Sequence, residues 1–171
     1  MKDSAKNKEQ NYQHIVHPFP PLFHSESKIL ILGSLPSVKS REEMFFYGHP
    51  QNRFWKMLSQ IFQVPVPQNI EEKKQLILAH NLALWDAIYS CDIIGSSDSS
   101  IKNVTPTDLT DILNNSKVQK VICNGKTSGK YYKQYQMKLT QIKPVILPST
   151  SPANAAWTLD RLAEQWGKEL L

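Results

Sequence analysis

Short aliphatic runs recur along the chain, and each is followed by Gly, polar or turn-forming residues. They lie at residues 28–33, 82–85, 118–123 and 144–147. Runs of this length are typical of strands buried on both faces of a parallel sheet. Segments with helical periodicity separate them, and this alternation predicts an α/β fold. We expect a three-layer αβα sandwich around a short, mainly parallel four-stranded sheet.

One helical pattern follows Asn52, which is a candidate N-cap. Apolar residues with a spacing of 3.6 form one face of this helix, namely Phe54, Trp55, Leu58, Ile61 and Phe62. Further helices are predicted over residues 71–80, 108–114 and 128–137.

A final helix is predicted near the carboxyl terminus. Ser151 would be its N-cap and Pro152 its first residue, and an apolar stripe continues to Leu170. By contrast, the polar stretch from Gly95 to Asn103 predicts a loop.

The length of 171 residues fits one domain. Residues 1–11 hold no periodic apolar residues and are predicted to be a disordered tail, so residues 12–171 form the single domain. No aliphatic run approaches the roughly 18 residues of a membrane span, and no secretory signal is present. We therefore expect a cytoplasmic protein with no membrane partner. Cys91 and Cys123 are expected to be reduced and structural.

Basic residues exceed acidic ones, 20 against 15, which gives a net charge of +5 and favours a polyanionic partner. The excess is concentrated between Lys102 and Lys143, where eight lysines face two aspartates for a local charge of +6. Lys126, Lys130 and Lys133 would share one helix face with Tyr132 nearby, as a surface that follows a nucleic-acid backbone does. A solvated lysine face is the alternative interpretation.

Several classes of enzyme are excluded by motifs that the chain lacks. The five histidines show no ligand spacing with carboxylates, so no metal is expected. The segment around Ser34 and Ser37 lacks the nucleophile elbow of serine hydrolases. Neither a phosphate-binding loop nor a dinucleotide fingerprint occurs, since residues 124–127 lack the first Gly of the former. We therefore expect no cofactor.

The segments that directly follow the predicted strands are rich in Gly, Ser, Pro and amide side chains. They are residues 33–37, Asp86 with the Ser-rich loop, residues 124–127 and residues 148–152. In open α/β sheets the ligand binds beyond the carboxyl ends of the strands. Backbone N–H groups and hydroxyls there suit a phosphate or the edge of a planar base, although loops of many α/β proteins share this composition.

Two of these segments resemble a known family. Gly33 to Ser37, followed after a gap by Tyr47 to Trp55 with its sequence YGHPQNRFW, is similar to the first motif of the mismatch-specific uracil and thymine DNA glycosylases. These enzymes belong to the uracil-DNA glycosylase superfamily. The stretch from Leu147 to Ala155 resembles the second conserved loop of that superfamily, which enters the minor groove beside the lesion. The resemblance extends from about His17 to the end of the chain.

One position departs from the mismatch-specific pattern. Leu35 stands where that branch has its catalytic Asn, and an aliphatic side chain cannot orient water. The chain is in this respect similar to the hypoxanthine-acting branch, the deoxyinosine DNA glycosylases. There the Asn of the His-Pro-x-Asn segment is thought to serve instead, which is Asn52 here.

The resemblance implies a glycosylase that flips a deaminated base, hypoxanthine or uracil or both, out of double-stranded DNA, including mismatches, and leaves an abasic site. It implies a monomer, associated with the nucleoid when bound to DNA. Asn52 would position water and Tyr47 would stack on the base. The implied base pocket consists of Gly33, Ser34, Leu35, Pro36, Tyr47, His49 and Asp86. The implied DNA-binding loop consists of Pro148, Ser149, Thr150, Ser151, Pro152 and Asn154. Phosphate contacts would come from Lys126 and Lys130.

Each of these roles has a structural alternative. Asn52 is also consistent with a plain N-cap, and Tyr47 with an aromatic residue of the core. His49 is also consistent with a structural histidine, and Asp86 with a helix cap as well as a base contact. A non-catalytic damaged-DNA binding module that lost its amide at Leu35 is the second functional hypothesis. A hydrolase of free nucleosides is a third.

Overall fold

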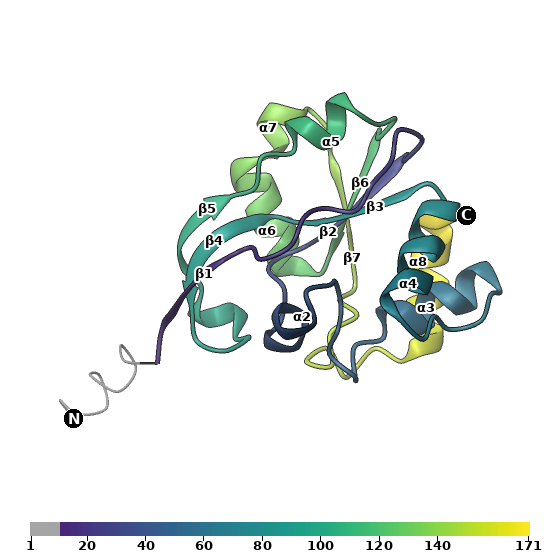
Figure 1. Ribbon diagram of the computed structural model, residues 1–171, viewed down its shortest axis with the longest axis horizontal. Coiled ribbons are helices and arrows are strands. Elements are labelled where there is room, and N and C mark those ends of the chain that lie inside the picture. Colours follow the sequence, from purple (N-terminus) through teal and green to yellow (C-terminus); the bar gives the residue numbers. More distant parts are fainter. Residues whose placement is uncertain (1–10) are drawn as a thin grey trace.

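The computed structural model describes residues 11–171, and a four-stranded parallel sheet forms its centre (Figure 1). The strand order is β3-β2-β6-β7. The strands are β2 (Ile29–Gly33), β3 (Leu82–Asp86), β6 (Lys120–Asn124) and β7 (Pro144–Leu147). All four predicted strands are thereby confirmed. The predicted tail lies, apart from its last residue, outside the described residues.

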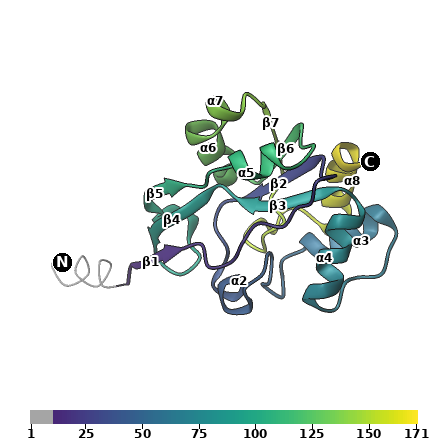
Figure 2. The ribbon, with the colours of Figure 1, turned by 45° about the horizontal axis from the view of Figure 1, so that its top comes forward.

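Helices cover both faces of this sheet, as the three-layer prediction requires (Figures 1 and 2). One group, which includes the contacting pair α3 and α8, consists of α3 (Phe54–Phe62), α4 (Ile70–Ala79) and α8 (Leu159–Leu170). The other consists of α5 (Thr110–Asn114), α6 (Lys126–Tyr135) and α7 (Met137–Thr140). The central strand β2 is sealed between the layers, because Leu30, Ile31 and Leu32 are fully buried.

A second, three-stranded antiparallel sheet was not predicted. Its order is β1-β4-β5, and its strands are β1 (Gln13–Val16), β4 (Ile88–Ile93) and β5 (Lys102–Pro106). These strands carry many polar residues and pair mainly with one another, so they lack the aliphatic runs that marked the central sheet. The predicted loop over Gly95–Asn103 is correct only in part, since it contains a 3₁₀ turn, η1 (Asp98–Ser100), and β5 begins at Lys102.

The predicted start of the last helix is wrong. Helix α8 begins at Leu159, and its N-cap is Thr158, whose hydroxyl accepts a hydrogen bond from the Arg161 amide at 3.2 Å. Residues 148–158 form an irregular loop with isolated turns instead, in which the carbonyls of Ser151 and Asn154 accept from the amides of Asn154 and Trp157 and also from Arg53. Ser151 makes only a local turn, in which its hydroxyl accepts from the Ala153 amide at 3.2 Å.

Two smaller helical predictions also need correction. A short helix, α2 (Val38–Glu43), was not predicted, and Ser37 is its N-cap. Helix α6 begins at Lys126 rather than Ser128, and its Tyr132 is fully buried, so this ring does not accompany the exposed lysines. The Tyr132 hydroxyl instead donates to the Ile142 carbonyl at 2.7 Å.

The two cysteines are buried and free, as predicted. Burial raises the pKa of Cys123 to about 11 and also raises the pKa of Cys91, so neither thiol is activated. Within residues 11–171, no helix has the length and apolar character needed to span a membrane.

Candidate active site

A cavity of about 410 Å³ opens at the carboxyl ends of the parallel strands. Five loops line it, and three of them follow strands β2, β6 and β7 directly. This is the place where open α/β sheets bind ligands. The lining residues comprise 33–37, Tyr47, Asn52, Asp86, 96–99, 124–127, 149–151 and Ala153.

The floor of the pocket depends on the absence of a side chain at Gly33. A Cβ atom built there would lie 2.4 Å from Asp86 Oδ1 and 3.3 Å from the Tyr47 hydroxyl oxygen. Gly33 and Asp86 are paired in register at the ends of β2 and β3. A glycine at this position therefore lets a carboxylate and a phenol approach the same point of the floor.

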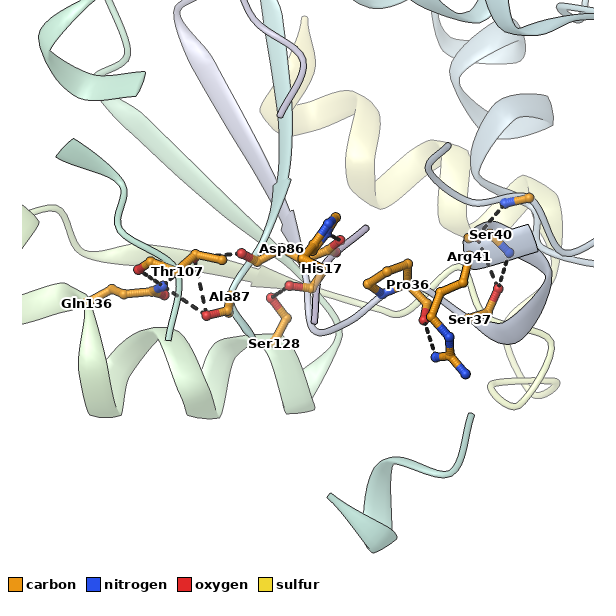
Figure 3. A network of polar contacts seen from close by, with 12 residues as sticks. His17, Pro36, Ser37, Ser40, Arg41, Asp86, Ala87, Thr107, Ser128 and Gln136 are labelled. Atoms are coloured by element: carbon orange, nitrogen blue, oxygen red, sulfur yellow. Dashed lines mark hydrogen bonds and ion pairs between the residues drawn. The ribbon is translucent and has the colours of Figure 1, made fainter. Parts of the chain in front are cut away.

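Asp86 is held from behind by His17. The distance between His17 Nε2 and Asp86 Oδ2 is 2.7 Å, and both side chains are buried (Figure 3). The imidazole packs against Trp85 and Phe19, with ring centroids 4.2 and 4.7 Å away. The sequence does not reveal this pairing, which joins residues 69 positions apart.

The pairing fixes where the proton of His17 lies. Its Nδ1 is buried and has no hydrogen-bond partner within residues 11–171. A buried N–H without an acceptor is rarer than a buried acceptor without a donor, so the proton belongs on Nε2, where it is donated to Asp86. The second carboxyl oxygen of Asp86, Oδ1, accepts no hydrogen bond from the described residues, and Asp86 lines the pocket.

The backbone around Asp86 is pinned by other side chains. The Thr107 hydroxyl donates to the Asp86 carbonyl at 2.7 Å, and Gln136 donates to the carbonyls of Ala87 and Thr107 (Figure 3). On the neighbouring strand, the Ser128 hydroxyl donates to the Leu32 carbonyl at 2.7 Å. The floor is therefore preorganised before any ligand arrives.

Tyr47 stands beside this floor in a fixed orientation. Its ring stacks on Phe54 with centroids 4.0 Å apart, and its backbone has φ of +53°. That conformation costs a non-glycine residue about 1 kcal/mol or more and is kept where the surroundings require it. Burial, followed by the charge of Asp86, raises the pKa of Tyr47 far above its usual value, so the hydroxyl remains a donor. This hydroxyl is buried and has no partner among the described residues.

Asn52 belongs to a hydrogen-bond chain that defines which way its amide points. The backbone N–H of Thr150 donates to Asn124 Oδ1 at 3.0 Å, which places Asn124 Nδ2 against the Thr150 hydroxyl oxygen, also at 3.0 Å. The hydroxyl proton of Thr150 must then go to Asn52 Oδ1, 2.8 Å away. The Phe54 amide donates to the same oxygen at 3.0 Å.

The consequence is that Asn52 offers the pocket a donor. A carbonyl oxygen has two lone pairs, and both are occupied by Thr150 and Phe54. The Nδ2 group has no partner among residues 11–171 and is available to a ligand. The predicted N-cap position of Asn52 is wrong by one residue, since Arg53 is the N-cap of α3, although the Asn52 oxygen still accepts from the first amide of the helix.

The Ser-rich loop, predicted as a segment at the ligand-binding edge of the sheet but not assigned to the base pocket, forms another wall. Ser96, Ser97, Asp98 and Ser99 all line the cavity. The loop is tied to the first motif by Arg41, which donates to the carbonyls of Pro36 at 2.9 Å and Gly95 at 3.3 Å. Figure 3 shows the Pro36 contact. The serine-rich composition of this loop and its resemblance to the family were the features of the sequence from which its place in the site could have been predicted.

The structure brings most predicted site residues together, but not all. Lys126 lines the cavity, and Lys130 is exposed one turn further along α6. His49 is not in the lining, and its Nδ1 accepts from the Gln51 amide at 3.1 Å. Three residues of the predicted DNA-binding loop also lie outside the lining, namely Pro148, Pro152 and Asn154. Within residues 11–171 no group of three or more His, Cys, Asp or Glu side chains is arranged to hold a metal ion.

This site and fold match a known superfamily. The model of the uracil DNA glycosylase superfamily matches residues 20–169, and the chain belongs to that superfamily. It is 32% identical over 148 residues to a hypoxanthine DNA glycosylase from Methanosarcina acetivorans, which covers 85% of this chain and 92% of that protein. It is 33% identical over 140 residues to a hypoxanthine DNA glycosylase from Methanosarcina barkeri, covering 80% of this chain and 86% of the relative.

A solved structure agrees with these relatives. The solution NMR structure of a proposed uracil DNA glycosylase from Methanosarcina acetivorans superposes with a TM-score of 0.77 at 27% identity, covering 91% of this chain and 97% of that chain. The predicted family and fold class are confirmed. The chain is a DNA N-glycosylase, a hydrolase of the bond between a base and deoxyribose.

Proposed function

We propose that this glycosylase removes hypoxanthine from deoxyinosine in double-stranded DNA, with uracil as a second candidate base, and leaves an abasic site. The observation that carries the proposal is the pairing of Leu35 with Asn52 in one pocket. Leu35 stands where the mismatch-specific branch has its catalytic Asn. A different amide side chain, that of Asn52, presents its Nδ2 donor to the same pocket. Two relatives named hypoxanthine DNA glycosylases support the choice of base.

The reaction breaks the bond between N9 of hypoxanthine and C1′ of deoxyribose. The electron pair of that bond goes to the base, and positive charge develops on the sugar in an oxocarbenium-like transition state. The oxygen of water then bonds to C1′, and one of its protons ends on the released base. Catalysis therefore needs donors toward the base and a group that holds water, but no strong nucleophile.

The donors available to the base come from two segments. Asn52 Nδ2 is one of them, and the backbone N–H groups of Ser34 and Leu35, which donate to no group among residues 11–171, are the others. In this proposal they hydrogen-bond the oxygen and ring nitrogens where negative charge develops. Because its oxygen is occupied, Asn52 would hold water by donating to the water oxygen.

Selection of the base is assigned to the floor. Asp86 Oδ1 is an acceptor that suits a ring N–H, which hypoxanthine carries at N1 and uracil at N3. Adenine presents an unprotonated N1, and two acceptors facing each other are left without a hydrogen bond. Tyr47 supplies the aromatic wall for a base extruded from the helix, a step that costs a few kcal/mol and less at a mismatch.

Binding of duplex DNA is assigned to the loop 148–154 and to α6. The loop would fill the space left by the flipped base, and Lys126 and Lys130 would contact phosphates, which makes affinity depend on salt. The protein is proposed to act as a monomer.

The test uses duplexes that contain one deoxyinosine or one uracil. Chromatography of the products should show free hypoxanthine, and alkali should then cleave the strand at the same position. No cleavage is expected without alkali, because no lysine is proposed as a nucleophile. Absence of free base and of alkali-labile sites with every deaminated base would refute the proposal.

A further inference from the structure

One side chain, Arg53, makes more hydrogen bonds to the loop between β7 and α8 than any other, while Trp157 is the residue of the loop that packs against the hydrophobic core. Within it Ala153, Ala155 and Ala156 are exposed, and residues 148–158 form only turns. Exposed alanines contribute little burial, so another interaction must define the shape of this segment. That interaction comes from Arg53, about one hundred residues away in sequence.

The guanidinium of Arg53 donates to four carbonyl groups of the loop. Nε donates to Thr150 at 3.3 Å, and Nη2 donates to Ser151 at 2.8 Å and to Asn154 at 3.0 Å. Nη1 donates to the Trp157 carbonyl. The backbone N–H of Arg53 adds a bond to the Thr150 carbonyl at 3.1 Å. The loop is therefore wrapped around a single planar cation.

This cation forms no ion pair with any carboxylate of residues 11–171. Among the described residues, carbonyl dipoles alone compensate its positive charge. The planar guanidinium has five N–H donors, and this geometry allows one side chain to bond four acceptors at once. A lysine has the same charge but three donors on a compact ammonium, so it cannot reproduce the arrangement.

Thr150 is held in a different way from the rest of the loop. Asn124 bonds to both its backbone N–H and its hydroxyl, independently of Arg53. Residues 151–157 make no hydrogen bond to the sheet; besides the Arg53 contacts, they are held by packing of Trp157 against the core and by Arg161 at the Ala156 carbonyl. Loss of the guanidinium should therefore release residues 151–157 while Thr150 stays in place beside Asn52.

We infer that Arg53 is the positioning residue of the loop that meets duplex DNA, and that its guanidinium sets residues 151–157 in the shape that replaces a flipped base. The inference rests on the proposed function, because the loop has this task only in a glycosylase that empties a position in the base stack. A segment that must be rigid to enter a stacked duplex loses affinity when it has to be ordered on binding.

The experiment compares Arg53→Lys with wild-type protein and with Arg161→Lys as a matched control. Arg161 touches the outside of the same loop, stacking on Trp157 at 4.2 Å and donating to the Ala156 carbonyl at 3.2 Å. Two quantities are measured. One is amide hydrogen exchange of peptides from residues 150–158, and the other is affinity for a tetrahydrofuran abasic-site analogue in duplex and in single-stranded DNA.

For Arg53→Lys we expect faster exchange confined to this loop and about tenfold weaker binding of the abasic duplex. Binding of the matching single strand should change less than about twofold, because a single strand has no stack to fill. Arg161→Lys should behave like wild type in both measurements. Unchanged loop exchange, or equal losses on duplex and single strand, would overturn the inference.

These measurements separate the inference from the proposed function. Hydrogen exchange and binding of an abasic analogue need no turnover, so they decide the role of Arg53 even where no base is released. Conversely, release of hypoxanthine by wild-type protein together with unaltered loop exchange in Arg53→Lys would contradict only the positioning role.

Discussion

The hydroxyl of Thr150 donates a hydrogen bond to Asn52 Oδ1 over 2.8 Å, and this contact joins two motifs that are 98 residues apart. It decides what Asn52 can do chemically. With the Phe54 amide it occupies the amide oxygen, so the Nδ2 group is the part of Asn52 that faces a substrate. The orientation of the Asn52 amide follows from the backbone N–H of Thr150. This N–H fixes the amide of Asn124, which in turn directs the Thr150 hydroxyl toward Asn52.

Removing the hydroxyl of Thr150 tests this relationship. In Thr150→Val the side chain keeps its volume, but Asn52 Oδ1 loses one donor and its amide can rotate. We expect the single-turnover rate of base release to fall about tenfold, corresponding to roughly 1.4 kcal/mol of transition-state stabilisation. Thr150→Ser retains the hydroxyl and should keep most of the rate. Equal rates for Thr150→Val and Thr150→Ser would show that the contact does not orient the amide.

The close approach of Asp86 to Gly33 at the floor of the pocket should make glycine strictly required at residue 33. The methyl group of Gly33→Ala would lie 2.4 Å from Asp86 Oδ1, in a segment pinned by neighbouring hydrogen bonds. We expect destabilisation of about 1–3 kcal/mol, measured by urea unfolding, together with loss of base release.

The matched control for Gly33 is Gly167 in α8. A Cβ there would meet its nearest atom, Ile61 Cγ1, at an ordinary 3.9 Å. Gly167→Ala should therefore stabilise the protein by up to about 1 kcal/mol, since alanine is the better helix former. If Gly33→Ala leaves the stability unchanged or raises it as Gly167→Ala does, the crowding at Gly33 has been overestimated.

Asp86 should determine which ring position of the base must carry a proton. A methyl group at N1 of deoxyinosine removes the N–H, so wild-type protein should release 1-methylhypoxanthine far more slowly than hypoxanthine. In Asp86→Asn the amide oxygen accepts from His17, so an NH2 donor replaces the acceptor oxygen in the pocket, and we expect this discrimination to shrink by about tenfold. Parallel single-turnover assays on the two substrates measure it. A ratio that is unchanged by the substitution would remove Asp86 from base selection.

The lysines of α6 should set the salt dependence of DNA binding. Each phosphate contact that is lost reduces the slope of log K against log salt by about 1. Lys126→Ala and Lys130→Ala should each have this effect on duplex affinity. Lys74→Ala, an exposed lysine of α4 on the other helical layer, should leave the slope as in wild type. An equal reduction by all three substitutions would point to general charge rather than to a defined contact.

Much of the fold can be predicted from local patterns in the sequence, because buried parallel strands consist of short aliphatic runs. The runs around Ile31 and Ile122 are found where the structure has its central strands. The same pattern does not predict strands β1, β4 and β5. They are strands because of their pairing partners and not because of their own composition. The false start of α8 at Ser151 has a similar origin, because the conformation of residues 151–157 includes long-range bonds to Arg53, which the local Ser-Pro signal does not reveal.

The candidate site shows the same division. Motif spacing places Asn52 and Tyr47 in the pocket, since both lie in one continuous segment that resembles the family. It does not reveal His17, Asn124 or Arg53 as partners of site residues, because each acts across a long sequence separation through hydrogen bonds that only the folded chain defines.

The donor role of Asn52 is tested most directly by single-turnover release of hypoxanthine from a deoxyinosine duplex, comparing wild type with Asn52→Asp. The aspartate has the same size and can still accept from Phe54 and Thr150, but it offers no N–H to the pocket. We predict a loss of about 100-fold or more, similar to that of Asn52→Ala, with unfolding curves that match wild type. Wild-type rates in Asn52→Asp would contradict the account, because they would mean that an acceptor, rather than a donor, is what catalysis needs at this position.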